Sequence, residues 1–181
     1  MNTGKKTAIS LREIPVESDV TGIEKILISS DFFSTEEILV AQSLVREKLI
    51  LGNSSTYQFL FAVNTDSVIG FTCFGHIPLT ASSFDLYWLA VHDEQRGKGL
   101  GAQLLRNVET SVIRLGGTHL YVDTSSRTQY IPTRNFYEHM GYQRGAFLPD
   151  FYRPDDGKVI YYKRLCPLHL QPLIYLDILP L

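Results

Sequence analysis

The amino-acid sequence predicts a single α/β domain built around one mixed β-sheet. The chain has 181 residues, enough for one domain with a buried core. Strand-like apolar runs alternate with longer segments whose apolar residues recur at helical spacing. In order, these segments predict a strand, two helices, three strands, a helix, a strand, a helix and two strands, which is typical of an α/β fold. We expect the domain to span residues 8–165, followed by an apolar tail at 166–181.

The first half of the domain is predicted to hold one strand, two helices and three further strands. In the first helix, Ile23, Ile26 and Leu27 share one face. Ser34 or Thr35 can cap the second helix, whose first turn carries the glutamates that the helix dipole favours. The predicted ranges are a strand at 8–15, helices at 20–30 and 34–52, and strands at 57–63, 68–77 and 84–91.

The second half is predicted to continue with two helices and three strands. Pro132 suits the first turn of the later helix, because its missing N–H costs nothing there. The earlier helix has an apolar stripe at a spacing of four residues, formed by Leu100, Leu104, Val108 and Val112. The predicted ranges are a helix at 99–115, a strand at 118–124, a helix at 132–140, and strands at 142–148 and 158–165 that pair across a loop at 149–157.

The composition is that of an ordinary globular protein, with 44% hydrophobic and 20% charged residues. A net charge of -2 argues against a surface for nucleic acid, which needs a strong basic excess. The two cysteines, Cys73 and Cys166, have the spacing of neither a zinc site nor a disulfide scaffold. The start, MNTGKKTAIS, has no apolar signal core, and no run approaches the ~18 apolar residues of a membrane span. We therefore expect a cytoplasmic protein with no metal and no membrane contact.

A glycine-rich junction at 92–101, HDEQRGKGLG, joins the strand at 84–91 to the following helix. A helix N-terminus presents unpaired backbone N–H groups, and glycine lets an anion approach them closely. Arg96 and Lys98 add positive charge. A plain turn with two solvated cations is the alternative interpretation. The spacing matches neither the dinucleotide fingerprint nor the P-loop, so the pattern favours an anion site of another kind.

Two motifs resemble those of the GNAT superfamily of acyl-CoA-dependent N-acyltransferases. The segment RGKGLG at 96–101 matches the family pattern Arg/Gln-x-x-Gly-x-Gly/Ala after a strand, although Asp93 stands where the family has proline. The segment NFYEHMGY at 135–142 is similar to a family helix end. The order of the predicted elements also agrees with the GNAT fold, so the resemblance covers most of residues 8–165.

The resemblance implies a binding site for acetyl-CoA. Backbone N–H groups of 97–101 would cradle the pyrophosphate of coenzyme A. The end of the strand at 85–91 would splay from its neighbour, so that its main chain pairs with the pantetheine arm and a backbone N–H polarises the thioester carbonyl. Tyr130 stands where many relatives carry an asparagine that touches the cofactor. The implied cofactor-binding residues are Leu89, Ala90, Val91, Arg96, Gly97, Lys98, Gly99, Leu100, Gly101 and Tyr130.

The implied reaction needs a base for the attacking amine and an acid for the leaving thiolate. Deprotonating a lysine-like amine with a pKa of ~10.4 at pH 7 costs about 4–5 kcal/mol of free energy. Asp85 and Asp123 match positions where relatives carry a glutamate base, and each would act through a water because aspartate is shorter. Each is equally explained as a strand-end acid that bonds turn amides. Tyr137 matches the family's general acid, with a packing role in an amphipathic helix as the alternative.

The sequence therefore indicates an N-acetyltransferase that moves an acetyl group from acetyl-CoA to a primary amine by direct attack. The acceptor, a small molecule or a peptide, is left open. The alternative is a non-catalytic acyl-CoA-binding sensor of the same fold. Arg127, Arg134 and Arg153 are open between a substrate carboxylate, the cofactor and solvent. The tail at 166–181 suits a strap or an edge strand, and a homodimer is one way to bury it.

Overall fold

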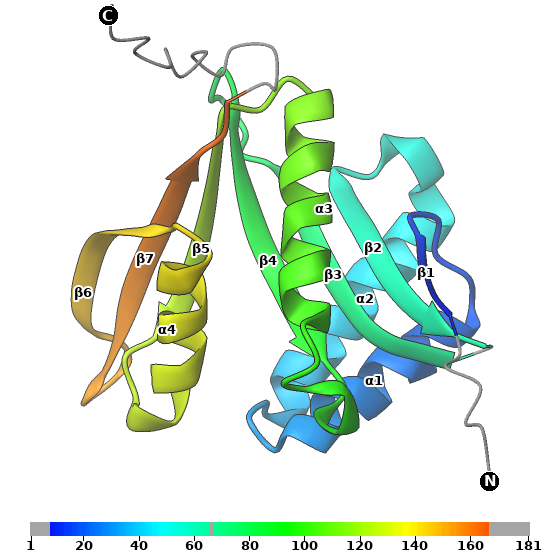
Figure 1. Ribbon diagram of the computed structural model, residues 1–181, viewed down its shortest axis with the longest axis horizontal. Helices are drawn as coiled ribbons and strands as arrows, with labels where there is room; N and C mark the ends of the chain where they lie inside the picture. The colour runs from blue at the N-terminus through cyan, green and yellow to red at the C-terminus, as the bar shows by residue number, and fades with distance from the viewer. Residues whose placement is uncertain (1–7, 66, 167–181) are drawn as a thin grey trace, which may run out of the picture.

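The chain folds into one seven-stranded β-sheet with helices on both faces (Figure 1). The computed structural model describes residues 8–65 and 67–166. Its elements are β1 Ile9–Arg12, α1 Ser18–Ser30, α2 Thr35–Leu51, β2 Tyr57–Asn64, β3 Ser67–His76, β4 Ser83–Val91, α3 Leu100–Arg114, β5 His119–Ser125, α4 Ile131–His139, β6 Gln143–Arg153 and β7 Asp156–Arg164, with short 3₁₀ helices at Gly52–Ser54, Asp93–Gln95 and Thr128–Tyr130. The strand order is β1-β2-β3-β4-β5-β7-β6, and among these described strands only β4 and β5 pair in parallel. The predicted mixed sheet and element order are confirmed.

Local signals set the ends of α2. The Ser34 hydroxyl accepts a hydrogen bond from the Glu37 N–H at 3.2 Å, and the Glu37 carboxylate accepts one from the Ser34 N–H at 2.7 Å. This capping box satisfies two amides that a helix start leaves without partners. Of the two predicted caps, Ser34 is therefore the one used. Gly52 ends the helix with a φ angle of 54°.

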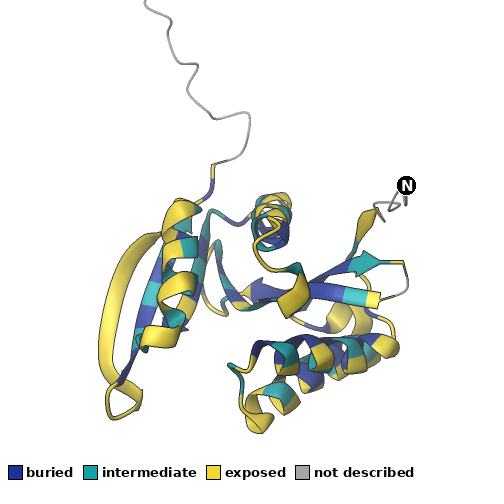
Figure 2. Ribbon diagram, turned by 60° about the horizontal axis from the view of Figure 1, so that its bottom comes forward, coloured by how far each residue is buried: buried dark blue, intermediate teal, exposed yellow. Residues whose placement is uncertain are grey.

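Two hydrophobic layers hold the sheet between the helices. α1 and α2 pack on one face of β2, β3 and β4, and α3 packs on the other (Figure 2). The predicted helix faces are confirmed, because Ile23, Ile26 and Leu27 in α1 are fully buried, as are Leu104 and Val108 in α3. Each large apolar side chain buried in this way contributes roughly 1.5–3 kcal/mol. Both layers therefore anchor β4, the strand that leads to the glycine-rich junction.

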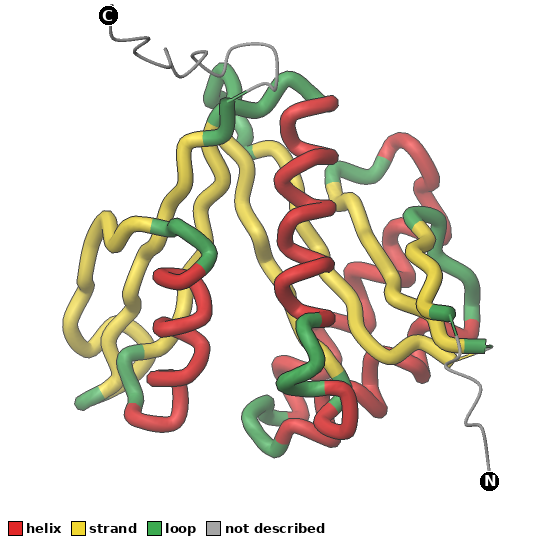
Figure 3. Tube along the Cα trace, in the orientation of Figure 1, coloured by secondary structure: helices red, strands yellow, loops and turns green. Residues whose placement is uncertain are grey.

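The sheet opens between its two central strands. β4 pairs with β5 from Ser83↔His119 to Leu86↔Val122, and the ladder ends there. On its other side β4 has a β-bulge, because Cys73 pairs with Trp88 and the next residue of β3 pairs with Leu86. A bulge bends a strand, and this one lies at the residue where β4 leaves β5. Figure 3 shows β5, β7 and β6 diverging from the other strands below this point.

The last hairpin differs from the prediction. The expected loop at 149–157 is mostly strand, since β6 runs on to Arg153 and β7 begins at Asp156. Proline cannot donate to a sheet ladder, so Pro149 and the acidic residues around it favoured a loop. β6 is an edge strand, where a missing donor is tolerated, and it is exposed along its length (Figure 2). Asp155, at a φ of 64°, makes the tight turn.

Two further expectations concern the cell compartment and the tail. Within the described residues, the structure has no helix long and apolar enough to cross a membrane. Cys73 is buried, Cys166 is exposed, and both thiols are free. The predicted tail lies outside the described residues from 167 onward, so its packing and the homodimer stay predictions.

Candidate active site

A cleft of about 730 Å³ lies where β4 and β5 part. We call it the central cleft. Its walls come from the loop after α1, the start of α2, β4, β5, the segment from Arg127 through α4, and the turn between β6 and β7. Asp85, Asp123, Tyr130, Tyr137 and Leu89 all line it, so five predicted site residues from four parts of the chain meet in one place.

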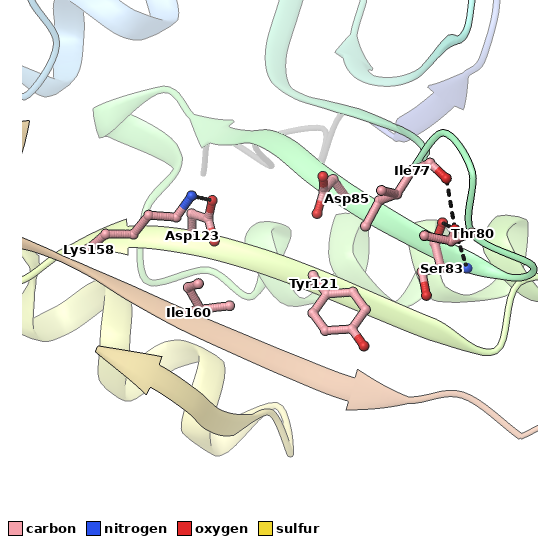
Figure 4. A pocket seen from close by; sticks show the side chains of 8 residues that line it. All are labelled: Ile77, Thr80, Ser83, Asp85, Tyr121, Asp123, Lys158 and Ile160. Atoms are coloured by element: carbon pink, nitrogen blue, oxygen red, sulfur yellow. Dashed lines mark hydrogen bonds and ion pairs between the residues drawn. The ribbon is translucent and has the colours of Figure 1, made fainter. Parts of the chain in front are cut away.

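A second, smaller hollow of about 330 Å³ adjoins the central cleft on the open face of the sheet. Asp85 and Asp123 line both spaces. Figure 4 shows these two carboxylates on neighbouring strands, with the Lys158 ammonium paired to Asp123. The hollow continues past Tyr121 and Ile77 toward the β3–β4 connection. The two candidate bases therefore lie in one hollow, close enough for the charge of Asp123 to act on Asp85.

Asp85 is the carboxylate without a direct cation partner. Among the described residues, no lysine, arginine or histidine nitrogen makes a salt bridge to it, whereas Asp123 is bonded to Lys158. Burial raises the pKa of Asp85, and the negative charge of Asp123 raises it further, while Lys158 lowers it. A raised pKa makes a carboxylate a stronger base than an exposed one.

Tyr137 is held rigidly on α4 by other aromatic rings. It is 5% exposed, and its ring centroid lies 5.7 Å from that of Tyr142 and 6.1 Å from that of Tyr161. Those two neighbours donate their own hydroxyls to Glu109 and Glu138. Burial raises the pKa of Tyr137, so its phenol stays protonated over the physiological range. Tyr137, which lines the cleft, therefore keeps its phenolic proton.

The glycine-rich junction forms an open loop in front of α3. Gly97 and Gly99 have φ angles of 69° and 83°, which L side chains rarely adopt, and Gly99 is the N-cap of α3. A Cβ built on either would meet no described atom within 4 Å, so their backbone faces open space. Arg96 pairs with Asp93 at 3.2 Å and Lys98 bonds Gln95 at 3.4 Å, so both cations lie beside the loop.

The two sequence motifs meet in the folded chain. A Cβ built on Gly101, in the first turn of α3, would lie 3.8 Å from Leu89 Cδ2 and 3.8 Å from Phe136 Cε2. The start of α3 thus abuts both the free end of β4 and α4. Ala90 and Val91, paired with Phe71 and Gly70, continue β4 from the cleft toward the loop. Neither these two residues nor 96–101 line the cleft itself.

A buried carboxylate ties the loop before α4 to β7. Asp156 is 4% exposed, accepts a hydrogen bond from the Ser125 hydroxyl and pairs with Arg127 Nε at 3.0 Å. Arg134 donates to the Ser125 carbonyl at 2.7 Å. Arg127 and Arg134 therefore bind a side chain and a backbone carbonyl of the protein itself. Arg153, 60% exposed and 3.7 Å from Asp156, keeps more freedom.

Several residues of the cleft carry no recognisable sequence signal. Phe32 and Phe33 follow α1, Glu36 lies in the first turn of α2, and Tyr152 ends β6. Their contribution depends on distant segments folding beside β4. Thr124 is different, because it follows Asp123 at the end of a predicted strand, where a search for polar side chains near the candidate base would find it.

Comparison with known proteins agrees with this geometry. The model of the acetyltransferase (GNAT) domain family matches residues 55–144. A solved candidate acetyltransferase of the GNAT family from Desulfovibrio desulfuricans is 38% identical, with a TM-score of 0.86 over 88% of this chain and 100% of that one. A curated, uncharacterised N-acetyltransferase of Methanocaldococcus jannaschii is 26% identical over 142 residues, which is 73% of this chain and 88% of that protein.

These matches place the chain in an acyl-transferring class of enzyme, and its sheet opens between two parallel strands beside a glycine loop and a helix. The chain belongs to the GNAT family of acetyltransferases. A protein from Salmonella typhimurium solved with its cofactor acetyl-CoA has a TM-score of 0.69 over 89% of this chain and 96% of that one. Its 17% identity shows the shared fold alone.

Proposed function

We propose that this protein transfers an acetyl group from acetyl-CoA to a primary amine by direct attack. The observation that carries the proposal is one continuous feature. The free end of β4 runs from the central cleft, which holds Asp85 and Tyr137, to the open loop at 96–101. A thioester cofactor with a phosphate-bearing end needs both parts, one apolar and one rich in N–H groups.

The residues of the loop and of β4 fit such a cofactor. Gly97 and Gly99 leave the space in front of their backbone clear, and the N–H groups that open α3 have no carbonyl upstream. Beyond Leu86, the edge of β4 that faces β5 has no strand partner in the described structure. Leu89, Ala90 and Val91 on that edge would hold the pantetheine arm, and the loop would hold the pyrophosphate. When bound, acetyl-CoA supplies the acetyl thioester and leaves as a thiolate.

Asp85 is our preferred base, with Asp123 as a modulator of its charge. The acceptor amine arrives protonated, and its proton must go to a nearby group before nitrogen can attack. Asp85 has the raised pKa and lacks a bonded cation, whereas Lys158 occupies the carboxylate of Asp123. A water between amine and carboxylate would carry the proton, because an aspartate is short.

Tyr137 is our preferred acid. Its phenol lines the cleft and stays protonated, because burial raises its pKa. An ordinary thiol has a pKa of about 8.5, so a neighbouring phenol protonates the departing sulfur when the negative charge develops. The main-chain N–H groups of the free β4 edge would polarise the thioester carbonyl at the same time.

The charges at the cleft favour a cationic acceptor. Glu36 stands at the wall formed by α2, where hydrogen bonds from its own backbone N–H and from Ser34 lower its pKa and keep it ionised. Asp85 lies on the wall formed by β4. Phe33, Trp88 and Tyr152 add apolar surface between them. We also propose a cytoplasmic location, where free thiols such as Cys166 stay reduced.

An amine screen tests this function. The enzyme is mixed with acetyl-CoA and, in turn, an amino acid, a polyamine, an amine antibiotic or a peptide with a free N-terminus, and the released thiol is measured. We expect saturable release with one class of amine and loss of most of it in Tyr137→Phe. Calorimetric binding of coenzyme A with no turnover on any amine would favour the acyl-CoA sensor instead.

A further inference from the structure

Thr124 has a buried hydroxyl with no partner at the wall of the central cleft. Within residues 8–65 and 67–166, the buried side-chain atoms that lack a hydrogen bond are Asn64 Oδ1, Thr72 Oγ1 and Thr124 Oγ1. Of these three residues, Thr124 lines the cleft. It is 6% exposed, so solvent does not freely satisfy its hydroxyl. Buried polar groups are rarely left unpaired, and an orphan at a binding cleft points to a ligand.

The polar neighbours of Thr124 in β5 have partners of their own, whereas the Thr124 hydroxyl has none among the described residues. Its neighbours in β5 are committed, Asp123 to Lys158 and Ser125 to Asp156. Its backbone pairs with Val159 of β7 on one side. On the other side, the ladder to β4 ended two residues earlier, at Val122. The hydroxyl therefore lies beside the gap that the two parted strands leave.

We propose that the Thr124 hydroxyl binds an amide group of the pantetheine arm of acetyl-CoA. This inference rests on the proposed function, which puts that arm along the free edge of β4. An amide has one hydrogen-bond donor and one acceptor, and a hydroxyl can form a hydrogen bond with either of them. The only other polar side chain suggested for this role, Tyr130, packs its ring against Phe32 and lies under Arg127.

The chain contains a matched control for this residue. Thr72 on β3 is fully buried, has the same orphan hydroxyl and pairs with Leu89 of β4. It does not line the cleft. Replacing either threonine with valine nearly keeps the shape of the side chain and puts a methyl group in place of the hydroxyl. Both changes should leave the melting temperature of the free protein unchanged or slightly higher, because each removes an unsatisfied buried group.

Calorimetry with two probes tests the assignment in the full-length chain. Coenzyme A carries the pantetheine arm, and 3′,5′-ADP lacks it. We expect Thr124→Val to weaken coenzyme A binding by about fivefold to twentyfold and to leave 3′,5′-ADP binding unchanged. Thr124→Ser should bind coenzyme A within about threefold of the wild type, since it keeps the hydroxyl. Thr72→Val should bind both probes as the wild type does.

The outcomes separate this inference from the proposed function. A folded Thr124→Val that binds coenzyme A normally overturns the role of Thr124 but leaves the function standing. Equal weakening for both probes also overturns it, because the defect would not involve the arm. A wild type that binds no coenzyme A overturns the proposed function, and this inference with it. If Thr124→Val does not fold, Thr124→Ala removes the hydroxyl without the added methyl group, and the same results decide.

Discussion

Phe32 and Tyr130 contact each other across the central cleft, with ring centroids 5.7 Å apart and ring planes tilted by 37°. Phe32 follows α1, and Tyr130 precedes α4. The Arg96 guanidinium lies 5.3 Å from the centre of the Phe32 ring, and that of Arg127 lies 5.3 Å from the Tyr130 ring. Two neighbouring rings with a cation at each end thus connect the glycine-rich loop to the Asp156 network, and each cation–ring contact is worth about 0.5–1 kcal/mol where solvent reaches it.

We predict that the ring of Tyr130, rather than its hydroxyl, supports cofactor binding. Tyr130→Ala removes the contacts to Phe32 and Arg127 and should weaken coenzyme A binding several-fold, measured by calorimetry. Tyr130→Phe keeps the ring and should bind normally. The same loss in both variants would show that the hydroxyl matters, and no loss in either would leave Tyr130 a purely structural residue.

We predict that Gly99→Asp abolishes coenzyme A binding, by at least about 100-fold, because a side chain and a negative charge would enter the phosphate cradle. Gly116→Asp is the matched control. Gly116 also has a positive φ, 84° against 83°, and open space around it, but it follows the other end of α3. Both substitutions carry backbone strain of about 1 kcal/mol. Normal affinity in folded Gly99→Asp, measured calorimetrically, would refute the cradle.

Tyr137→Phe should lower kcat by about 10²-fold or more and change the affinity for acetyl-CoA little, because it removes a proton donor and keeps the ring. Tyr142→Phe serves as the comparison. Tyr142 is a buried neighbour whose hydroxyl binds Glu109 and does not line the cleft. The Tyr142→Phe variant should be less stable than the wild type but should keep its kcat. Steady-state kinetics test this prediction. An unchanged kcat in Tyr137→Phe, with the chemical step rate-limiting, would mean that Tyr137 has only a packing role.

Asp85→Asn should lower kcat by about 10²-fold or more at pH 7, where the amine carries a proton that must be removed. Asp123→Asn should cost less, because that carboxylate is bonded to Lys158. The deficit of Asp85→Asn should shrink toward pH 10, where free amine and hydroxide replace the base. Rates from pH 7 to 10 test this. A constant ratio of wild-type to variant rate, for both variants, argues against a carboxylate base.

The Asp85→Asn substitution should also stabilise the folded protein at neutral pH. Burial and Asp123 raise the pKa of Asp85, so the folded state prefers the protonated carboxyl. Binding of this proton stabilises the fold fully below the unfolded pKa of ~3.9. The stabilisation is lost as the pH rises through the folded pKa. Asp85→Asn should therefore melt higher than the wild type at pH 7, with a difference that vanishes toward pH 4. Thermal unfolding of both proteins at pH 7 and pH 4 tests this. A wild type that melts higher than Asp85→Asn at pH 7 would contradict it.

Elements whose signals are local were predictable. The capping box at Ser34 and the apolar face of α3 depend on residues within one or two turns. The exception is the last hairpin, where Pro149 and Asp155 favour a loop in isolation. Asp155 does lie in the turn, but Pro149 lies within β6, because β6 is an edge strand, which is a property of the assembled sheet.

The family motifs and candidate catalytic residues were also accessible from sequence. A loop that needs positive φ angles at Gly97 and Gly99 requires glycine, so its chemistry leaves a visible pattern. Tyr137 was found by its place in the second motif. Between Asp85 and Asp123, the sequence favours Asp85 only by its place on the strand expected to bind the cofactor, since both are aspartates at strand ends. Their difference arises from Lys158, which lies on β7.

The walls of the cleft were decided by tertiary structure alone. The family resemblance predicts that the end of β4 splays from its neighbour, and the structure confirms this, because the β4–β5 ladder ends at Leu86 beside a bulge at Tyr87. The gap between β4 and β5 leaves the Thr124 hydroxyl without a partner and lets Phe32 reach Tyr130 from the opposite wall. Backbone preferences act over a few residues, whereas burial, charge pairing and ring contacts act between segments far apart in the chain. For this reason the chain's own sequence pointed to its family, and only the packed sheet assigned surroundings to each candidate catalytic group.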